Sequence, residues 1–338
     1  MRVHNSPAWR FGAGGVLYGT TKCSLNFNGN VFSMAPPTSP GGAWTYTALH
    51  SFVGFPSDGA LPTAPVAIGG GGVLYGTTSI GGNSATCFVS PKSTHPSGCG
   101  TVFQLTPPAT AGGPWTESVL YNLAGSEDGP GPNAVVIGRG GVLYGSTYLG
   151  GTGACFDGCG SVFSLTPPAS PGGTWTEAVL GDFAGGSDGA NPSAVAIGSG
   201  GVLYGTTNSG GASIHGTVFS LAPPASPGGA WTYATLHSFA GLAGDGAAPT
   251  APVVIGKGGL LYGTTTEGGP ANVGTLFRLA PPASPGGAWT ETVLHRFTGG
   301  DDGADPVAGL VISRNGALYG TTSGGGASGA GTVFVLRP

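Results

Sequence analysis

A block of about 57 residues repeats six times along this 338-residue chain, and the repeat constrains the fold more than any other feature. A Leu-Tyr-Gly triplet marks each copy most clearly. The triplet tyrosines are 57, 69, 60, 58 and 57 residues apart. A fixed period of this order is the signature of a solenoid, a propeller or an array. The six tyrosines are Tyr18, Tyr75, Tyr144, Tyr204, Tyr262 and Tyr319.

The repeat at residues 192–239 shows what one copy contains. Four short segments rich in β-branched, aromatic or other apolar residues are predicted strands, at 192–197, 202–207, 217–221 and 231–239. Glycine-rich and proline-rich loops separate them, because proline has no N–H to contribute to a strand ladder. No stretch shows helical periodicity. Four short antiparallel strands, repeated six times, predict an all-β fold, a six-bladed β-propeller.

The order of strands within a blade follows from their composition. We place the first strand innermost, because it is the shortest and most uniformly apolar, and the fourth, which carries a tryptophan, outermost. The chain then starts with an innermost strand at 3–11 and ends with a third strand at 332–336, so blade 6 lacks its outermost strand. We expect one propeller domain over 1–338, with blades at about 3–52, 63–123, 132–183, 192–239, 250–297 and 306–338.

Composition excludes several functional classes. Only ten lysines and arginines are present and the net charge is −4, so the chain lacks a basic surface for nucleic acid. No apolar run reaches the length of a membrane span. Charged residues are 7% of the chain, which predicts a surface of glycine, serine, threonine and asparagine, as in many exported bacterial proteins. No signal peptide is visible in the sequence.

The two ends of each predicted blade carry different loops. The loops between second and third strands (the 2–3 loops) and the connections from one repeat to the next (the inter-repeat connections) share one end. The two insertions, at 79–100 and 148–160, are both in 2–3 loops, which have about nine residues elsewhere. Elaboration at one end of a repeat fold is typical of a binding face.

All five cysteines are in 2–3 loops. Cys87 and Cys99 bracket one loop, and Cys155 and Cys159 bracket the next, which indicates two disulfides and an oxidising compartment. The alternative is a metal site, since zinc would tolerate three residues between Cys155 and Cys159. Cys23 has no partner in its own loop and is predicted to be free or intermolecular.

Three elements of the repeat together resemble the GloVer tandem repeat. They are Leu-Tyr-Gly-Thr-Thr, as in 203–207, Gly-Thr-Val-Phe, as in 216–219, and Asp-Gly-Ala-x-Pro, as in 188–192. This repeat is abundant in predicted exported proteins of Verrucomicrobia, Acidobacteria and related bacteria. The resemblance covers essentially the whole chain. It implies export and a propeller-like array, and it implies no established reaction or catalytic residue.

Five aspartates stand before a glycine in the inter-repeat connections. They could form a ring of carboxylates that attracts a cation such as Ca²⁺ or contacts a ligand. The structural alternative is that each Asp-Gly makes a turn in which the carboxylate accepts backbone N–H bonds. The five are Asp58, Asp128, Asp188, Asp245 and Asp302.

The histidines fall into two groups. His50, His237 and His295 occupy one repeat position, where other copies have Tyr121 and Gly181, so a structural role is predicted for that position. His4, His95 and His215 are outside the repeat pattern and map to the elaborated end, where a Zn²⁺ site is a candidate. No spacing rule connects these three. We therefore expect His4, His95 and His215 to be the candidate metal ligands, and His95 and His215 also to be candidate ligand-binding residues.

No Gly-x-Ser-x-Gly nucleophile motif is present, so the catalytic residues of any activity are unknown. Five of the six tryptophans begin fourth strands and are predicted packing anchors, whereas Trp9 is a candidate to line the central channel and bind a ligand. The sequence therefore predicts a secreted or cell-surface binding or surface-assembly module, its partner an extracellular polysaccharide or protein. A metal-dependent hydrolase or lyase at the channel mouth is the alternative, and a filament subunit joined through the open edge of blade 6 is the third.

Overall fold

The computed structural model describes residues 9–22, 28–87, 97–110, 112–125, 128–170, 172–226, 228–241, 245–284 and 286–338. The chain divides into two compact units. The first comprises Met1–Gly150 with Phe163–Val179, and the second comprises Gly151–Val162 with Leu180–Pro338. The prediction of a single domain over the whole chain stays a prediction.

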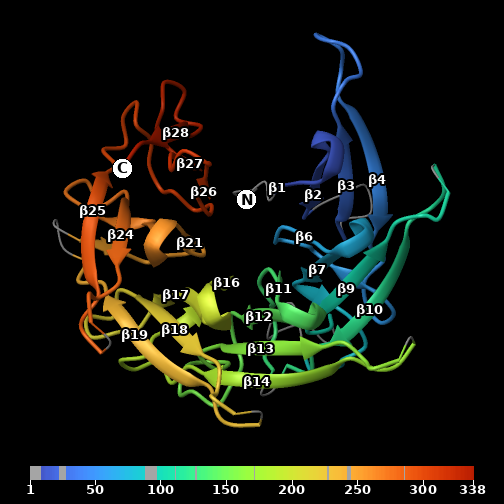
Figure 1. Cartoon of the computed structure of the whole chain (residues 1–338), viewed down its shortest axis with the longest axis horizontal. Helices are drawn as coiled ribbons and strands as arrows, with labels where there is room; N and C mark the ends of the chain where they lie inside the picture. Colours follow the sequence, from blue (N-terminus) through green and yellow to red (C-terminus); the bar gives the residue numbers. More distant parts are fainter. Residues whose placement is uncertain are drawn as a thin grey trace. The chain divides into compact units, whose positions relative to one another are not determined.

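Six small antiparallel sheets follow one another along the chain, one for each sequence repeat (Figure 1). The first three are β1 (Trp9–Phe11), β2 (Leu17–Thr21), β3 (Asn30–Ala35) and β4 (Thr45–Ser51); β6 (Ala67–Ile68), β7 (Leu74–Thr78), β9 (Thr101–Thr106) and β10 (Thr116–Asn122); and β11 (Val136–Ile137), β12 (Leu143–Thr147), β13 (Ser161–Thr166) and β14 (Thr176–Asp182).

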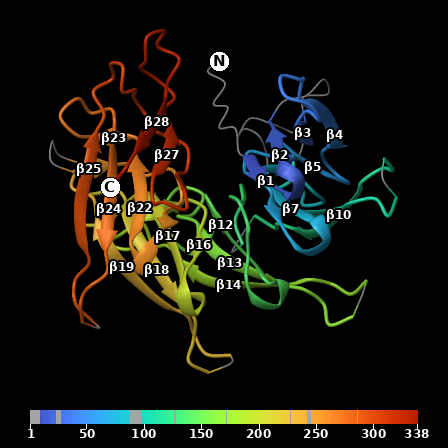
Figure 2. The same cartoon turned by 45° about the horizontal axis from the view of Figure 1, so that its top comes forward.

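The other three sheets have the same order of strands (Figure 2). They are β16 (Ala196–Ile197), β17 (Leu203–Ser209), β18 (Thr217–Ala222) and β19 (Thr232–Ser238), with β15 (Ala190–Pro192) also on β17; β21 (Val254–Ile255), β22 (Leu261–Thr265), β24 (Thr275–Ala280) and β25 (Thr290–Arg296); and β26 (Val311–Ile312), β27 (Leu318–Thr321) and β28 (Val333–Leu336).

The predicted strand order is confirmed. Each of the first five sheets runs from a first to a fourth strand in chain order, and the sixth has three strands in the described part of the chain. The fold class is therefore the all-β, six-bladed propeller, with three strands in the last blade among the described residues. Three-residue 3₁₀ turns join the first and second strands of the first five sheets, at Ala13–Gly15, Gly70–Gly72, Arg139–Gly141, Ser199–Gly201 and Lys257–Gly259.

The first strands are shorter than predicted. The segment expected at 192–197 is split into β15 and β16, both paired with β17. The interruption follows Pro192, which cannot donate a ladder hydrogen bond, and Ser193 returns to β17 by donating its N–H to the Thr206 carbonyl. Of the strand expected at 3–11, only β1 lies within the described residues.

The inter-repeat connections and the 2–3 loops lie together, as predicted. β5 (Gly59–Ala60), in the connection after the first sheet, pairs with β8 (Ile80–Gly81), in the 2–3 loop of the second. β20 (Gly246–Ala247) and β23 (Glu267–Gly268) repeat this pairing in the second unit. Each inter-repeat connection of this kind is thus hydrogen-bonded to the 2–3 loop of the following sheet.

Neighbouring sheets within a unit pack through aromatic side chains. Phe239, just after β19, is fully buried, and its ring centroid lies 5.1 Å from that of Phe277 on β24. The Leu-Tyr-Gly tyrosine also reaches the next sheet, since the centroid of Tyr204 lies 6.1 Å from that of Trp289. The same tyrosine contact joins Tyr18 to Trp115 and Tyr75 to Trp175.

The paired threonines after the triplet have separate tasks. Thr206 Oγ1 donates a hydrogen bond of 3.0 Å to the Ala251 carbonyl of the next repeat. Thr207 Oγ1 lies 2.9 Å from Thr217 Oγ1 on the adjacent strand and accepts the Thr217 N–H. Both hydroxyls are buried, where an unpaired polar group would be costly, so the first threonine joins sheets and the second joins strands.

The glycine of the triplet makes room for the phenylalanine of the third strand. A Cβ atom built on Gly205 would lie 2.6 Å from Cζ of Phe219, which is fully buried. We expect Gly205→Ala to lower the free energy of unfolding by about 1–3 kcal/mol, as overpacked core substitutions do. Urea denaturation would measure the change. Gly70→Ala is the control, because a Cβ there meets nothing within 4 Å, and equal stability of the two variants would contradict this packing.

Candidate functional site

The five aspartates of the inter-repeat connections organise the turns in which they lie. Asp58 accepts the N–H of Val53 at 2.9 Å and that of Gly59 at 2.6 Å. Asp128, Asp188, Asp245 and Asp302 likewise accept backbone N–H groups four or five residues upstream. This is the geometry of the structural alternative, and a further role in holding a ligand stays a prediction.

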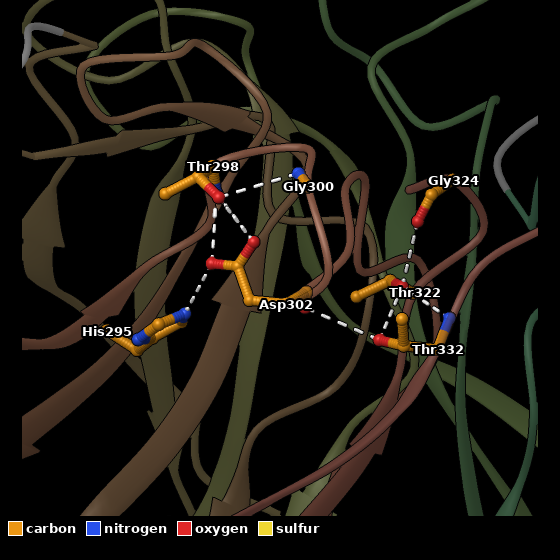
Figure 3. Close-up of polar contacts among 7 residues, drawn as sticks. All are labelled: His295, Thr298, Gly300, Asp302, Thr322, Gly324 and Thr332. Carbon is orange, nitrogen blue, oxygen red and sulfur yellow. Dashed lines mark hydrogen bonds and ion pairs between the residues drawn. The ribbon is translucent and has the colours of Figure 1, made fainter. Parts of the chain in front are cut away.

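The repeat position that varies among histidine, tyrosine and glycine faces these aspartates. His50 Nε2 lies 3.1 Å from Asp58 Oδ2, and the Tyr121 hydroxyl donates to Asp128 at 3.1 Å. Figure 3 shows a third copy, in which His295 Nε2 lies 3.0 Å from Asp302 Oδ2. The N–H of Thr298 donates a hydrogen bond to the same oxygen. The structural role predicted for this position is thus a side-chain hydrogen bond to the turn aspartate.

A glutamate from the next sheet completes the arrangement in the first unit. Glu117, on β10, approaches His50 at the end of β4 and Asp58 in the connection that follows it. One nitrogen or oxygen ligand atom from each of the three side chains lies within 4.8 Å of the others. We call these three residues the His50 cluster. His237, Asp245 and Glu291 are the corresponding residues of the second unit, with His237 Nε2 at 3.5 Å from Asp245 Oδ2.

Sequence reasoning missed the glutamates. They carry a visible signal, because Trp-Thr-Glu recurs at 115–117, 175–177 and 289–291, while the other two copies have Trp-Thr-Tyr. The substitution is complementary to the preceding repeat. Where that repeat has Gly181 in place of histidine, Tyr233 takes the place of glutamate, and its hydroxyl donates to the Asp188 carbonyl.

Burial and negative charge raise the pKa of two of these glutamates, Glu117 and Glu291. Burial, followed by the charge of Asp58, raises the pKa of Glu117 from 4.5 to about 7, although His50 opposes the shift. Burial and Asp245 raise the pKa of Glu291 in the same way. Burial and Asp128 raise the pKa of Tyr121, which keeps its hydroxyl a hydrogen-bond donor.

The raised pKa of Glu117 predicts a pH-dependent stability. Because the folded-state pKa of about 7 exceeds the ordinary 4.5, the folded protein binds the extra proton between those values. The contribution of this glutamate to the free energy of unfolding is therefore full below pH 4.5 and is lost as the pH rises to about 7. Glu117→Gln should flatten this part of the profile.

Urea denaturation at several pH values in a chelator would measure the effect. Glu267→Gln is the matched control, because it removes the same charge from an exposed position. An unchanged slope between pH 4.5 and 7 in Glu117→Gln would show that the carboxyl group is ionised throughout this range in the folded protein.

Both predicted disulfides are confirmed. Cys87 bonds to Cys99 and Cys155 bonds to Cys159, with Cα atoms 5.1 Å apart in each pair. Each lies against a glycine of its own repeat's connection, Gly125 or Gly185, both at positive φ, where a Cβ would come within 2.8 Å of both sulfurs. The disulfides therefore cover the turns that Asp128 and Asp188 organise.

In two of the other repeats a different side chain lies where the disulfide would be. The imidazole ring of His215 lies against Gly241, and the side chain of Asn28 lies against Gly54. This contact gives His215 a packing role in a turn. His4, His95 and Cys23 lie outside the described residues, so the predicted metal site at His4, His95 and His215 stays a prediction. The backbone of Trp9, in β1, pairs with that of Gly19 in β2.

The disulfide loops should stabilise the fold. Closing loops of these lengths, with sequence separations of 12 and 4, contributes about 2–3 kcal/mol each. Reduction with dithiothreitol should lower the free energy of unfolding by that amount per bond. Thiol counting on denatured, unreduced protein should find one reactive thiol, and five would contradict both bonds.

The 2–3 loops of the second unit also present apolar side chains to solvent. Phe156, inside the Cys155–Cys159 loop, is 85% exposed, and Ile214, in the next 2–3 loop, is 76% exposed. Ile214 has a φ of 62°, in the left-handed region that β-branched residues avoid. These two tips are the most exposed large apolar side chains of the described 2–3 loops.

The sheets and their order define a six-bladed β-propeller, and similar solved structures have this class of fold. A protein from Bacteroides uniformis with a proposed 6-phosphogluconolactonase assignment is 15% identical, with a TM-score of 0.56, covering 93% of this chain and 77% of that one. Trypanosoma rangeli sialidase is 13% identical, with a TM-score of 0.51, covering 97% and 54%. At these identities the likeness shows the fold alone.

The chain belongs to the Gloeobacter/Verrucomicrobia repeat family, whose model matches residues 85–334. The family membership agrees with the resemblance drawn from the repeat motifs. No functionally curated protein matches the sequence. The described residues include no helix long and apolar enough to cross a membrane.

Proposed function

We propose that this protein is a secreted propeller that acts as a binding module and holds an extracellular polysaccharide or protein at its 2–3 loops. The observation that carries the proposal is the exposure of Phe156 and Ile214 on successive 2–3 loops of one compact unit. Loops on a rigid scaffold are where repeat folds place their binding residues.

The backbone around both tips is held in place. The Cys155–Cys159 disulfide closes a turn around Phe156, and the neighbouring Asp157 has a φ of 58°. The positive φ of Ile214 costs conformational free energy, and such strain tends to occur at functional sites. Apolar side chains fixed in water-facing positions favour contact with the carbon face of a sugar ring or with an apolar pocket of a protein.

Other features support an extracellular location. Disulfides persist in oxidising compartments, and the described residues contain two. The low content of charged residues points the same way, since the surface relies on neutral polar side chains. The residues predicted to contribute to ligand binding remain Trp9, His95, His215 and the five turn aspartates. Self-association through the edge of β28 remains a predicted alternative.

The double variant Phe156→Ser/Ile214→Ser tests the proposal. We expect at least a tenfold loss of affinity for the ligand found by screening the wild-type protein on a polysaccharide microarray and on immobilised secreted proteins. Val179→Ser is the control, because it removes an apolar side chain that is 37% exposed in the middle of β14. Undiminished binding by the double variant would exclude these loops as the binding face.

A further inference from the structure

The His50 cluster has the residue types and the spacing of a metal site. His50 comes from β4, Asp58 from the following connection and Glu117 from β10 of the next sheet, so three separate segments converge. The three ligand atoms lie within 4.8 Å of one another, and His50 Nε2 is 3.1 Å from Asp58 Oδ2. Two ligands of a tetrahedral zinc ion, each about 2.0–2.1 Å from it, are about 3.3 Å apart. The histidine–aspartate edge therefore already has the required length.

The surroundings fix the aspartate and leave the glutamate unsatisfied. The N–H groups of Val53 and Gly59 hold the two oxygens of the buried Asp58 carboxylate. Oε1 of Glu117 is buried and has no hydrogen-bond partner among the described residues. A buried, unpaired polar oxygen is costly, and a second carboxylate nearby adds repulsion when both are ionised. A bound cation would remove both costs.

We propose that His50, Asp58 and Glu117 together bind one divalent transition-metal ion, of which Zn²⁺ is the best fit. Imidazole nitrogen and carboxylate oxygen are zinc ligands, and three protein ligands leave a fourth position for water. Ca²⁺ fits less well, because it takes six to eight oxygen ligands. The ion would link the first sheet to the second.

The chain contains its own comparisons for this site. The pair of His295 and Asp302 has hydrogen bonds from Thr298 (Figure 3), but no fourth strand follows in the described sixth sheet to supply a glutamate. The copy with Asp128 has Tyr121 in place of histidine. Among the described residues, only the His50 cluster brings three potential ligand atoms within 4.8 Å of one another.

Metal titration of the purified, chelator-stripped protein without an affinity tag tests the proposal. We expect Zn²⁺ to bind in isothermal titration calorimetry and to raise the melting temperature, and Co²⁺ to give visible absorption bands from the same site. Glu117→Gln and His50→Gln should each weaken Zn²⁺ binding at least tenfold and remove the thermal shift. Glu117→Gln keeps the shape of the side chain, and circular dichroism would confirm that it folds.

Glu177→Gln is the matched control, because Glu177 occupies the same position on β14 next to the tyrosine-containing copy. It should bind Zn²⁺ as the wild-type protein does. Absence of Zn²⁺ and Co²⁺ binding to the wild-type protein would overturn the proposal. Binding that is unchanged in both Glu117→Gln and His50→Gln would overturn it as well, because the ion would then lie elsewhere in the chain.

Discussion

The contact of a buried phenylalanine ring with the glycine of the neighbouring strand is the constraint on which the rest of each blade depends. Gly205 leaves space for Phe219, and the ring of Phe219 then lies 5.0 Å, centroid to centroid, from Phe183 just after β14. Phe239 and Phe277 repeat this edge contact one sheet further along. A single four-stranded sheet cannot bury such rings by itself, so each repeat needs a neighbour, which is the physical reason for the tandem array.

The same constraint determines where charge is tolerated. The buried residue that follows a fourth strand, a phenylalanine in four copies and Leu123 in the other, leads directly into the connection to the next repeat, and the N–H groups of that turn need an acceptor. Aspartate supplies it in every copy. Eight of the fourteen acidic residues of the chain are either these five aspartates or the three glutamates that follow a Trp-Thr pair. Most of the acidic residues therefore occupy repeat positions at the boundary between two sheets.

The repeat pattern was sufficient to predict the sheets, their strand order, the three-stranded last sheet and both disulfides, because each of these follows from residues within one copy. The His50 cluster could not be predicted in this way. Its glutamate belongs to the copy after the one that supplies His50 and Asp58. An alignment of the copies therefore relates Glu117 to Trp115 in its own repeat and gives no sign that it lies next to Asp58. The recognisable signal is a correlation between successive copies, in which histidine or Tyr121 precedes glutamate and Gly181 precedes Tyr233. The first strands were predicted too long. Pro192 interrupts the pairing with β17, and the position of this interruption is known only once the partner strand is known.

The copies of this boundary are different solutions to one electrostatic problem, the placing of a turn carboxylate between two sheets. Tyr121 donates a hydroxyl hydrogen bond to Asp128, and Tyr233 fills the space left by Gly181 and bonds to the backbone of Asp188. His295 pairs with Asp302 in the connection before the sixth sheet. Where histidine and glutamate both face the aspartate, Oε1 of the glutamate is buried without a hydrogen-bond partner among the described residues, at Glu117 in the first unit and at Glu291 in the second. In the first unit the ligand atoms of His50, Asp58 and Glu117 converge within 4.8 Å of one another, and a bound cation would offset the repulsion between the two carboxylates there.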